Sequence, residues 1–202
     1  MAKKIKTIIL DIGNVLVDFR WKAFIESFGY NEEIQKKVAA ASVLNKDWNE
    51  YDRGVLTDEE ILSLFVQNDP SIEEQLRIIF RSFDGLLKCF DYTESFIREL
   101  KEKGYRVLYL SNFSDKAYKE CGKELDFLKL TDGGILSYRC KLIKPDPAIY
   151  ELLKNMYSLN PAECLFFDDT EINILAAREA GYNAEVFTGY ENAKRIIFEC
   201  GI

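Results

Sequence analysis

The sequence contains no histidine, and this absence excludes several kinds of enzyme chemistry. Ser-His-Asp and Cys-His sites need an imidazole as the base, and many metal sites need imidazole ligands. Carboxylates, lysine, tyrosine and hydroxyl groups are left to carry any reaction.

Cysteine is scarce and lacks the spacing of a metal site. The cysteines are odd in number, lie far apart and form no C-x-x-C pair. This pattern argues against a disulfide framework and against a zinc site, and it predicts reduced thiols that pack as small apolar side chains. The residues are Cys89, Cys121, Cys140, Cys164 and Cys200.

Long apolar runs and basic clusters are also missing. The longest apolar runs, such as TIIL and CLFF, are far too short to span a bilayer, and the N-terminal MAKKIKTIIL lacks the features of a secretory signal. We therefore expect a soluble, cytoplasmic protein without a membrane partner. The chain carries 27 Lys and Arg against 34 Asp and Glu, a net charge of −7, so no nucleic-acid partner is expected either.

What is present is an ordered change in the spacing of apolar residues along the chain. At the N-terminus, KTIILDIG predicts a buried strand that runs into a turn. From Trp21 to Phe83 apolar residues recur at helical spacing, which predicts four or five helices, one of them begun by a capping box of Thr57 and Glu60. Beyond this segment, short apolar strands alternate with helices.

This order predicts an α/β fold, with a Rossmann-like, doubly wound parallel sheet covered by helices on both faces. The helical segment is then a helical-bundle cap inserted after the first strand. We predict a core domain of residues 1–18 and 88–202 and a cap domain of residues 19–87. Within the core, SDKAYKECGKEL is predicted as a helix and GGILSYRC as a short strand.

The residues that can carry chemistry stand at the ends of predicted strands. In an open parallel sheet, ligands bind beyond the carboxyl ends of the strands. Four separate segments therefore bring carboxylates, a hydroxyl, an amide and an ammonium group to one edge of the sheet. They are Asp11 after TIIL, Ser111 and Asn112 after VLYL, Lys144 after GGILSYRC, and Asp168 and Asp169 after LFF.

The convergence of three carboxylates implies a cation. Without histidine nearby they repel one another strongly, so a cation is needed to keep all three ionised. Mg²⁺ suits such oxygen ligands and completes its shell with water and phosphate oxygens, while a lysine and a Ser-Asn pair add donors for a phosphate. The set predicts a magnesium-assisted phosphoryl-transfer site in which one carboxylate attacks phosphorus.

Each of these residues also has a purely structural interpretation. An aspartate after a strand often caps a helix or forms a turn, and an Asp-Asp pair is commonly solvated. Ser111 and Asn112 are compatible with capping a helix that begins near Ser114. Their joint occurrence at one edge of the sheet favours the functional interpretation.

Four short motifs add a family resemblance. In this order DIGNV, LSN, KP and FFDDTEIN resemble the four motifs of the haloacid dehalogenase superfamily of aspartate-nucleophile hydrolases, and the helical insert resembles its cap. The resemblance covers essentially the whole chain, and four motifs in the right order are far more specific than any one alone. The first motif, D-x-G-N-V, is similar to that of a subgroup which includes sugar-phosphate phosphatases of the alpha-glucose-1-phosphate type.

The resemblance implies a nucleophile and a metal site. Asp11 would attack the phosphoryl group and become a phosphoaspartate. It would also ligate Mg²⁺, together with the backbone carbonyl of Gly13 and the side chain of Asp169. Asp168 would support the metal directly or through water.

The phosphate contacts follow from the same resemblance. Ser111 and Asn112 would bind phosphate oxygens, and Lys144 would balance the charge of the phosphate and the nucleophile. Asn173 could orient the metal loop, although a plain surface position on its helix is equally open.

One position departs from the family pattern. Phosphatases of the family usually have a second aspartate two residues after the nucleophile, which protonates the leaving oxygen and later activates water; here that residue is Gly13. The following Asn14 tolerates left-handed geometry, so we expect the turn to be kept. We also expect slow hydrolysis of the phosphoaspartate unless a cap carboxylate, Asp18 or the substrate helps.

The sequence thus predicts a magnesium-dependent phosphatase that hydrolyses small phosphate monoesters, with sugar phosphates among the candidates, through an aspartyl-phosphate. Three alternatives stay open. A 2-haloacid dehalogenase needs no metal, against which FFDD argues; a phosphomutase would pass the phosphoryl group to another acceptor; and a catalytically weak phosphate-binding or regulatory protein is motivated by Gly13. The partner is then a small-molecule phosphate ester, and the oligomeric state is open between monomer and dimer.

Substrate choice is expected to reside in the cap. An aromatic ring or a guanidinium group there can contact a sugar face or hydroxyl groups. Packing in the cap core, or a solvated position for the arginine, is an equally open interpretation. The candidates are Trp21, Trp48, Tyr51 and Arg53.

Overall fold

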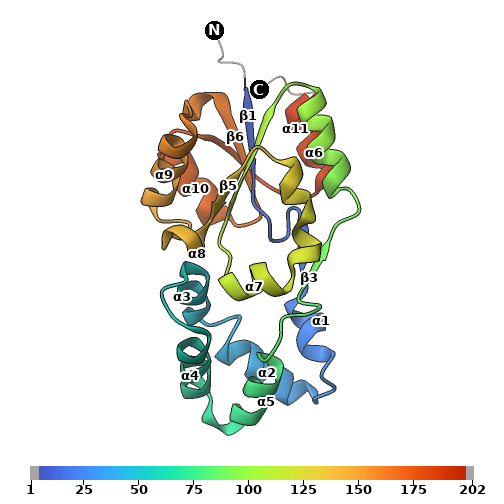
Figure 1. Cartoon of the computed structure of the whole chain (residues 1–202), viewed down its shortest axis with the longest axis vertical. Helices are drawn as coiled ribbons and strands as arrows, with labels where there is room; N and C mark the ends of the chain where they lie inside the picture. The colour runs from blue at the N-terminus through green and yellow to red at the C-terminus, as the bar shows by residue number, and fades with distance from the viewer. Residues whose placement is uncertain (1–4, 199–202) are drawn as a thin grey trace.

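A five-stranded parallel sheet forms the centre of the core in the computed structural model, which describes residues 5–198 (Figure 1). The strand order is β5-β4-β1-β6-β7, so β1 lies in the middle and its carboxyl end lies at the centre of one sheet edge. The predicted α/β fold with a parallel sheet is confirmed. The strands are β1 (Thr7–Leu10), β4 (Arg106–Ser111), β5 (Gly134–Leu136), β6 (Cys164–Asp168) and β7 (Asn183–Val186).

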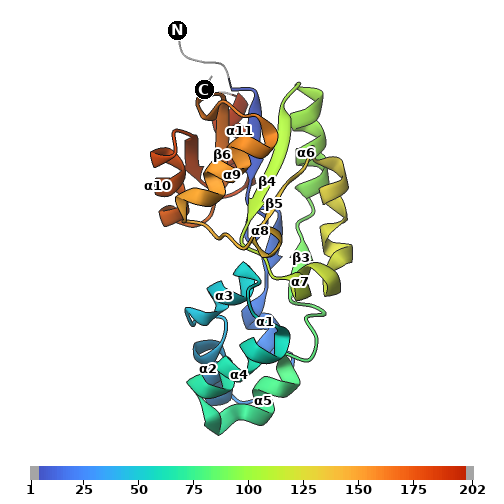
Figure 2. The ribbon, with the colours of Figure 1, turned by 60° about the vertical axis from the view of Figure 1, so that its left-hand side comes forward.

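Helices cover both faces of this sheet, as Figure 2 shows. Successive residues of a strand point to opposite faces, so in β1 Ile9 packs with one hydrophobic cluster while Ile8 and Leu10 pack with another. Both clusters are fully apolar, which explains why the strand reads as a continuous apolar run. The face of Ile9 is covered by α9 (Pro147–Tyr157) and α10 (Glu171–Glu179), after η3 (Pro161–Glu163); the other face is covered by α6 (Thr93–Glu102), α7 (Asp115–Glu120), η2 (Gly122–Leu130) and α11 (Tyr190–Phe198).

The segment after the first strand folds as a separate group of helices below the core in Figure 1. Thr57 and Glu60 form the predicted capping box at the start of α4. Trp48 lies among the aromatic side chains that fill the group, and its ring stacks on Phe65 with 6.1 Å between centroids. The helices are α1 (Trp21–Glu26), α2 (Glu32–Ala41), α3 (Asp47–Arg53), α4 (Asp58–Asn68), η1 (Pro70–Ile72) and α5 (Glu73–Ile79).

Two short strands connect this cap to the core. The strand β2 (Val17–Phe19) leads into the cap and β3 (Leu87–Cys89) leads out, and the two pair antiparallel to each other. The boundaries predicted at residues 18 and 88 fall within these strands. The division into two domains stays a prediction.

The structure differs from the expected elements at the contact between core and cap. GGILSYRC is predicted as a strand, but the strand ends at Leu136 and Ser137–Cys140 forms the short helix α8. Lys141 then takes a left-handed conformation (φ 64°) and its N–H bonds the Ser137 carbonyl, which closes a helical turn too short to leave a periodic pattern. SDKAYKECGKEL likewise divides into α7 and the 3₁₀ segment η2.

The structure also bears out the expected free thiols, and it provides a check for membrane-spanning helices. Cys89, Cys121, Cys140 and Cys164 are free thiols, as predicted, whereas Cys200 lies outside the described residues. Among residues 5–198, no helix combines the length and the apolar character that crossing a membrane requires.

Candidate active site

Asp11 directly follows the central strand and is only 7% exposed. Its N–H continues the ladder to β6 by bonding Phe167 O at 2.9 Å, and its Oδ1 accepts the N–H of Ile12 at 2.7 Å. Asn14 then takes the expected left-handed conformation (φ 56°), and its N–H bonds Val17 O. The turn therefore holds the Asp11 carboxylate at the middle of the sheet edge.

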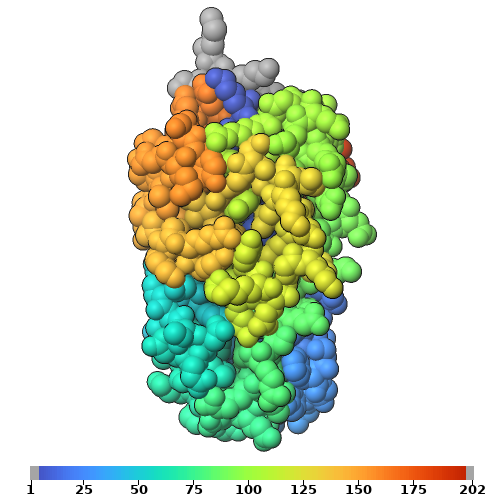
Figure 3. Space-filling model, in the orientation of Figure 1, coloured from blue at the N-terminus to red at the C-terminus, as the bar shows by residue number. Residues whose placement is uncertain are grey.

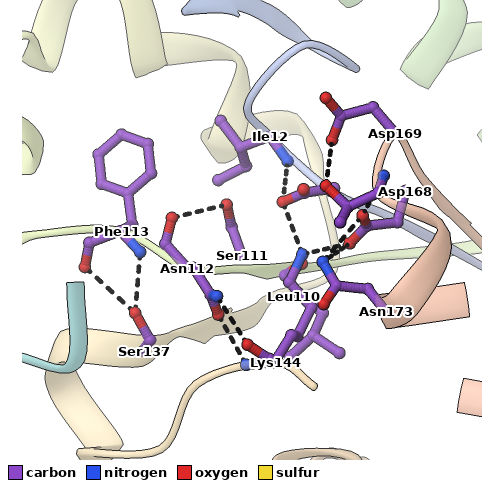
Figure 4. A network of polar contacts seen from close by, with 12 residues as sticks. Ile12, Leu110, Ser111, Asn112, Phe113, Ser137, Lys144, Asp168, Asp169 and Asn173 are labelled. Carbon is purple, nitrogen blue, oxygen red and sulfur yellow. Dashed lines mark hydrogen bonds and ion pairs between the residues drawn. The ribbon is translucent and has the colours of Figure 1, made fainter. Parts of the chain in front are cut away.

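Lys144 joins two of the predicted carboxylates (Figure 4). Its buried Nζ donates to Asp168 Oδ2 at 2.5 Å and to Leu110 O at 2.8 Å, and lies 3.0 Å from Asp11 Oδ1. An ammonium group has three protons, so these three oxygens use its whole donor capacity. Lys144 is thus fixed between β1, β4 and β6.

The charges in this cluster do not balance. Burial raises the pKa of Asp11 to about 7, because the Lys144 charge that lowers it is opposed by the charge of Asp168. Burial also opposes the charged form of Lys144, but the two carboxylates raise the pKa of its ammonium above the ordinary value. One buried cation therefore serves two buried carboxylates, and a second cation would let both stay ionised.

Asp168 has its oxygens filled by donors of the protein itself. Besides Lys144, Asn173 Nδ2 donates to both oxygens at 3.0 and 3.1 Å, and the Thr170 N–H donates to Oδ1 at 2.8 Å. Asn173 is buried, so the alternative of a plain surface position is wrong. Its amide contacts both oxygens of the Asp168 carboxylate.

Asp169 completes a group of three carboxylates. One oxygen from each of Asp11, Asp168 and Asp169 lies within 4.8 Å of the other two. Asp169 is half-buried, and its Oδ2 accepts Asn14 Nδ2 at 2.8 Å, which ties the first and last motifs together. A set of carboxylate oxygens at this spacing fits a hard divalent cation such as Mg²⁺.

Ser111 and Asn112 lie beside this cluster with different orientations. The buried Ser111 hydroxyl, at the end of β4, lies beside Asp11 and acts to lower the pKa of its carboxyl. The Asn112 side chain makes two hydrogen bonds to the backbone of Lys144. Its Nδ2 donates to the Lys144 carbonyl at 3.0 Å, and its Oδ1 accepts the Lys144 N–H at 2.8 Å. Neither residue caps α7, because that cap is the Ser114 side chain, which accepts the Ala117 N–H. The capping alternative is therefore wrong.

A cavity of about 210 Å³ opens above the carboxylates, between core and cap. On the face seen in Figure 3, cap and core atoms pack directly against each other. The core side of the cavity is mostly polar and the cap side mostly apolar. The core residues are Asp11, Gly13, Asn14, Ser111, Asn112, Phe113, Ser114, Ala117, Asp169 and Thr170, and the cap residues are Phe19, Trp48, Asp52, Leu86 and Leu87.

Of the four expected specificity residues, Trp48 alone lines this cavity. Tyr51 is buried in the cap, where its hydroxyl donates to Asp58 at 2.9 Å, and Arg53 pairs with Glu50 at 3.2 Å. Trp21 lines a separate hollow on the cap. The packing interpretation therefore fits Tyr51, and an ion pair on its own helix fits Arg53.

Sequence reasoning missed Asp52, the one ionisable side chain that the cap contributes to the cavity within the described chain. Burial, and next the charge of Asp11, raise the pKa of Asp52 to about 8, although Lys144 and a hydrogen bond from Trp48 act in the opposite direction. Asp52 shares a short helix with Asp47 and Glu50, so composition does not single it out. The available signal is its position one helical turn after Trp48.

Comparisons with known proteins agree with this architecture. Residues 5–181 match the family model described as haloacid dehalogenase-like hydrolase. The chain is similar to the sesquiterpene phosphatase astK of Aspergillus oryzae, with 24% identity over 90% of this chain and 89% of that protein. It is also 24% identical to the drimenol cyclase drtB of Aspergillus calidoustus over 95% of its own length, but spans only 35% of that protein.

Solved structures show the same fold. The HAD family enzyme bt-2542 of Bacteroides thetaiotaomicron superposes with a TM-score of 0.74 at 23% identity, covering 98% of this chain and 100% of that one. Its complex with magnesium and inorganic phosphate gives a TM-score of 0.68 at 24% identity, covering 90% and 93%. At such identities the likeness establishes the arrangement of the elements.

Proposed function

The chain belongs to the haloacid dehalogenase-like hydrolase family, and from that premise we propose that it is a magnesium-dependent phosphatase of small phosphate monoesters. The observation that carries the proposal is the Asp11–Lys144–Asp168 cluster with Asp169 beside it, in which Asp11 and Asp169 line the cavity and Lys144 and Asp168 are buried. A carboxylate nucleophile, a fixed cation and a set of metal-ligating oxygens are the parts that phosphoryl transfer through an acyl phosphate needs.

We assign the metal contacts to Asp11, Asp169 and the backbone carbonyl of Gly13. Asp168 is assigned a contact through water, because Lys144, Asn173 and the Thr170 N–H already occupy its oxygens. When bound, Mg²⁺ supplies charge neutralisation for the phosphate and for the carboxylates. The similar enzyme bt-2542, whose structure holds magnesium and inorganic phosphate, is in keeping with a site for both in this fold.

In the proposed reaction, Asp11 attacks phosphorus and the ester oxygen leaves, which forms an aspartyl-phosphate that water then hydrolyses. The Ser111 hydroxyl binds a phosphate oxygen, and Lys144, whose three protons are directed to Asp11, Asp168 and Leu110 O, balances the charge of the phosphate and the nucleophile. For Asn112 we propose a positioning role, because direct binding by its side chain would break two hydrogen bonds to the Lys144 backbone.

The cap residues that line the cavity indicate which leaving groups fit the site. Phe19, Trp48, Leu86 and Leu87 present an apolar surface above the phosphate position, which favours an apolar or flat group. The similar protein named a sesquiterpene phosphatase is in keeping with this wall. Sugar phosphates, suggested by D-x-G-N-V, stay in the candidate set because an aromatic ring such as Trp48 can pack against a sugar face.

The test is phosphate release from a panel of aryl, prenyl, sugar and simple alkyl phosphates, with Mg²⁺ and with EDTA, for the wild type and Asp11→Asn. We expect release that requires Mg²⁺ and Asp11. Halide release from 2-haloacids that is unaffected by EDTA would favour a dehalogenase, and transfer of phosphate within a sugar would favour a phosphomutase. Inactivity on the whole panel with retained phosphate binding would favour a regulatory protein.

A further inference from the structure

The position that lacks an acid faces open space. A Cβ built on Gly13 would meet no heavy atom within 4 Å, so the cavity continues where the usual second aspartate would stand. The hydroxyl or carboxyl that handles protons must therefore reach the leaving oxygen from another wall. Among the cap residues that line the cavity, Asp52 is the one with an ionisable side chain.

Asp52 is held at the contact between cap and core through its backbone. Its backbone carbonyl accepts the Ser137 hydroxyl at 2.5 Å, and the same hydroxyl oxygen accepts the Phe113 N–H at 2.8 Å. A second link joins Lys141 Nζ to the carbonyl of Gly54 just beyond the end of α3. The helix α3 is thereby fixed on α8 at the edge of the core, as Figures 1 and 2 show.

The surroundings of Asp52 suit a group that changes protonation. Trp48, one turn earlier, lines the cavity beside Asp52 and acts to lower the pKa of its carboxyl. The charged groups that act on it from the core are Asp11 and Lys144. Asp52 is half-buried, and its pKa of about 8 leaves the carboxyl mostly protonated at neutral pH. The charge of a bound phosphate acts in the same direction as that of Asp11.

The other carboxylate considered from the sequence is placed differently. Asp18 lies on β2, half-exposed, with Arg20 3.8 Å away, and it does not line the cavity. It is therefore a connector residue between core and cap, and the cap helix supplies the better-placed group.

We propose that Asp52 performs the proton transfers that residue 13 cannot, an inference that rests on the proposed phosphatase function. As the phosphorus–ester oxygen bond breaks and the Asp11–phosphorus bond forms, protonated Asp52 donates its proton to the leaving oxygen, which departs as an alcohol. The Asp52 carboxylate then accepts a proton from the attacking water. The Asp11–phosphorus bond breaks, hydrogen phosphate leaves, and Asp52 is protonated again. General acid/base help of this kind contributes about 10²- to 10⁴-fold.

The experiment compares leaving groups in Asp52→Asn, Asp52→Glu and the wild type. For Asp52→Asn we expect kcat/KM to fall about 100-fold or more with alkyl phosphates but less than about 10-fold with 4-nitrophenyl phosphate, whose leaving group needs no proton. In the wild type, kcat/KM should fall at high pH, where Asp52 loses its proton. This fall should be absent in Asp52→Asn. Asp52→Glu should recover part of the rate.

Two variants separate catalysis from structure. Glu50→Gln alters a carboxylate on the same helix that does not line the cavity, and should leave rates unchanged. Gly13→Asp, for which there is space, should restore alkyl phosphate turnover in the Asp52→Asn background. Binding of inorganic phosphate with Mg²⁺, measured by calorimetry, should be nearly the same in wild type and Asp52→Asn.

The two possible failures are distinct. Equal losses on all leaving groups, or a change in KM alone, in Asp52→Asn would overturn the role of Asp52 and leave the phosphatase function standing. A wild type that releases no phosphate from any ester would overturn the proposed function, and this inference with it.

Discussion

The two walls of the cavity differ in how their residues are held. On the core side, Asp11, Lys144, Asp168 and Asn173 form a continuous hydrogen-bonded network in which each group has its position fixed by several others. On the cap side, apolar residues surround a single carboxylate, Asp52. Under the proposed function, the core side would bind the phosphoryl group, which is the same in every substrate, and the cap side would bind the part of the substrate that varies.

This difference gives a criterion for interpreting variants. A change in the core should affect all esters alike, because the phosphoryl group is common to them. A change in the cap should depend on the leaving group. Variants and conditions that act on one side of the cavity test this difference between core and cap.

The largest effect is expected for Asp11→Asn. The amide keeps the shape of the side chain but removes the nucleophile, so kcat should fall about 10⁴-fold or more with every ester. The measurement is phosphate release across the leaving-group panel, with circular dichroism to verify folding. A loss of kcat that varies strongly with the leaving group would contradict the expectation that core residues affect all esters alike.

Replacement of Lys144 should cost the most stability. Lys144→Met leaves Asp11 and Asp168 buried without their cation, so the free energy of unfolding should fall by about 3 to 5 kcal/mol. Urea denaturation of the metal-free protein measures it. The control is Lys154→Met, an exposed lysine paired with Glu151, for which the change should stay within about 0.5 kcal/mol. Equal losses in the two variants would show that the network does not support the fold.

Magnesium should stabilise the folded protein by binding residues on the core side of the cavity, without help from the cap. A free concentration of 100 times Kd adds about 2.7 kcal/mol to the free energy of unfolding, seen as a rise in Tm. Asp169→Asn should reduce this rise, whereas Asp52→Asn should keep it. If the cap variant lost the Mg²⁺ response and the core variant kept it, the assignment of ligands would be wrong.

The metal-free protein should lose stability as pH rises from about 4 to about 7. The pKa of Asp11 is about 7 when folded against an ordinary 3.8, so in this window the native state holds a proton that the unfolded chain has released. The loss is about 2 kcal/mol, less than the full shift would give, because the ionisation of Asp11 is coupled to the charges of Lys144 and Asp168. Asp52, with a pKa of about 8, adds a slope of the same sign.

Urea unfolding at a series of pH values provides the measurement. Asp11→Asn should remove the part of the slope due to Asp11 and, because the Asp11 charge also raises the pKa of Asp52, reduce the part due to Asp52, which extends to about pH 8. A wild-type stability that rises through this window would contradict the charge imbalance in the core wall.

The smallest effect is expected from the apolar part of the cap. Phe19→Leu reduces the aromatic surface of the cavity, so kcat/KM should fall by up to about 10-fold, roughly 1.4 kcal/mol, for aryl and prenyl phosphates. Inhibition by inorganic phosphate should be unchanged, since the core binds it. Phe90→Leu, outside the cavity, is the matched control. A change in inhibition by inorganic phosphate would show that Phe19 contributes to phosphate binding, as the core residues are expected to do.

The core was largely predictable because its pattern is local and its topology is constrained. A strand such as TIIL is recognisable from four residues, and the parallel order brings the ends of β1, β4 and β6 to one edge. Asp11, Ser111, Lys144, Asp168 and Asp169 lie together there for that reason. Their roles in catalysis and metal binding stay proposals.

What the sequence did not reveal depends on how the parts pack. Asp52 gains its place only when α3 packs on α8, and α8 itself is four residues long, too short for periodicity to reveal. The side chain of Asn112 points to the Lys144 backbone because of a loop more than thirty residues away. Such orientations follow from tertiary contacts that no local pattern encodes.

The antiparallel pairing of β2 with β3 has a consequence for how this enzyme could diversify. The chain leaves the core and returns to it at hydrogen-bonded neighbours, Val17 opposite Cys89 and Phe19 opposite Leu87. Everything between these strands is, for the core, a closed loop whose length and content leave the sheet connectivity unaltered. Insertions or deletions within residues 20–86 that leave Asp52 in place would therefore preserve the sheet and the carboxylate cluster at its edge.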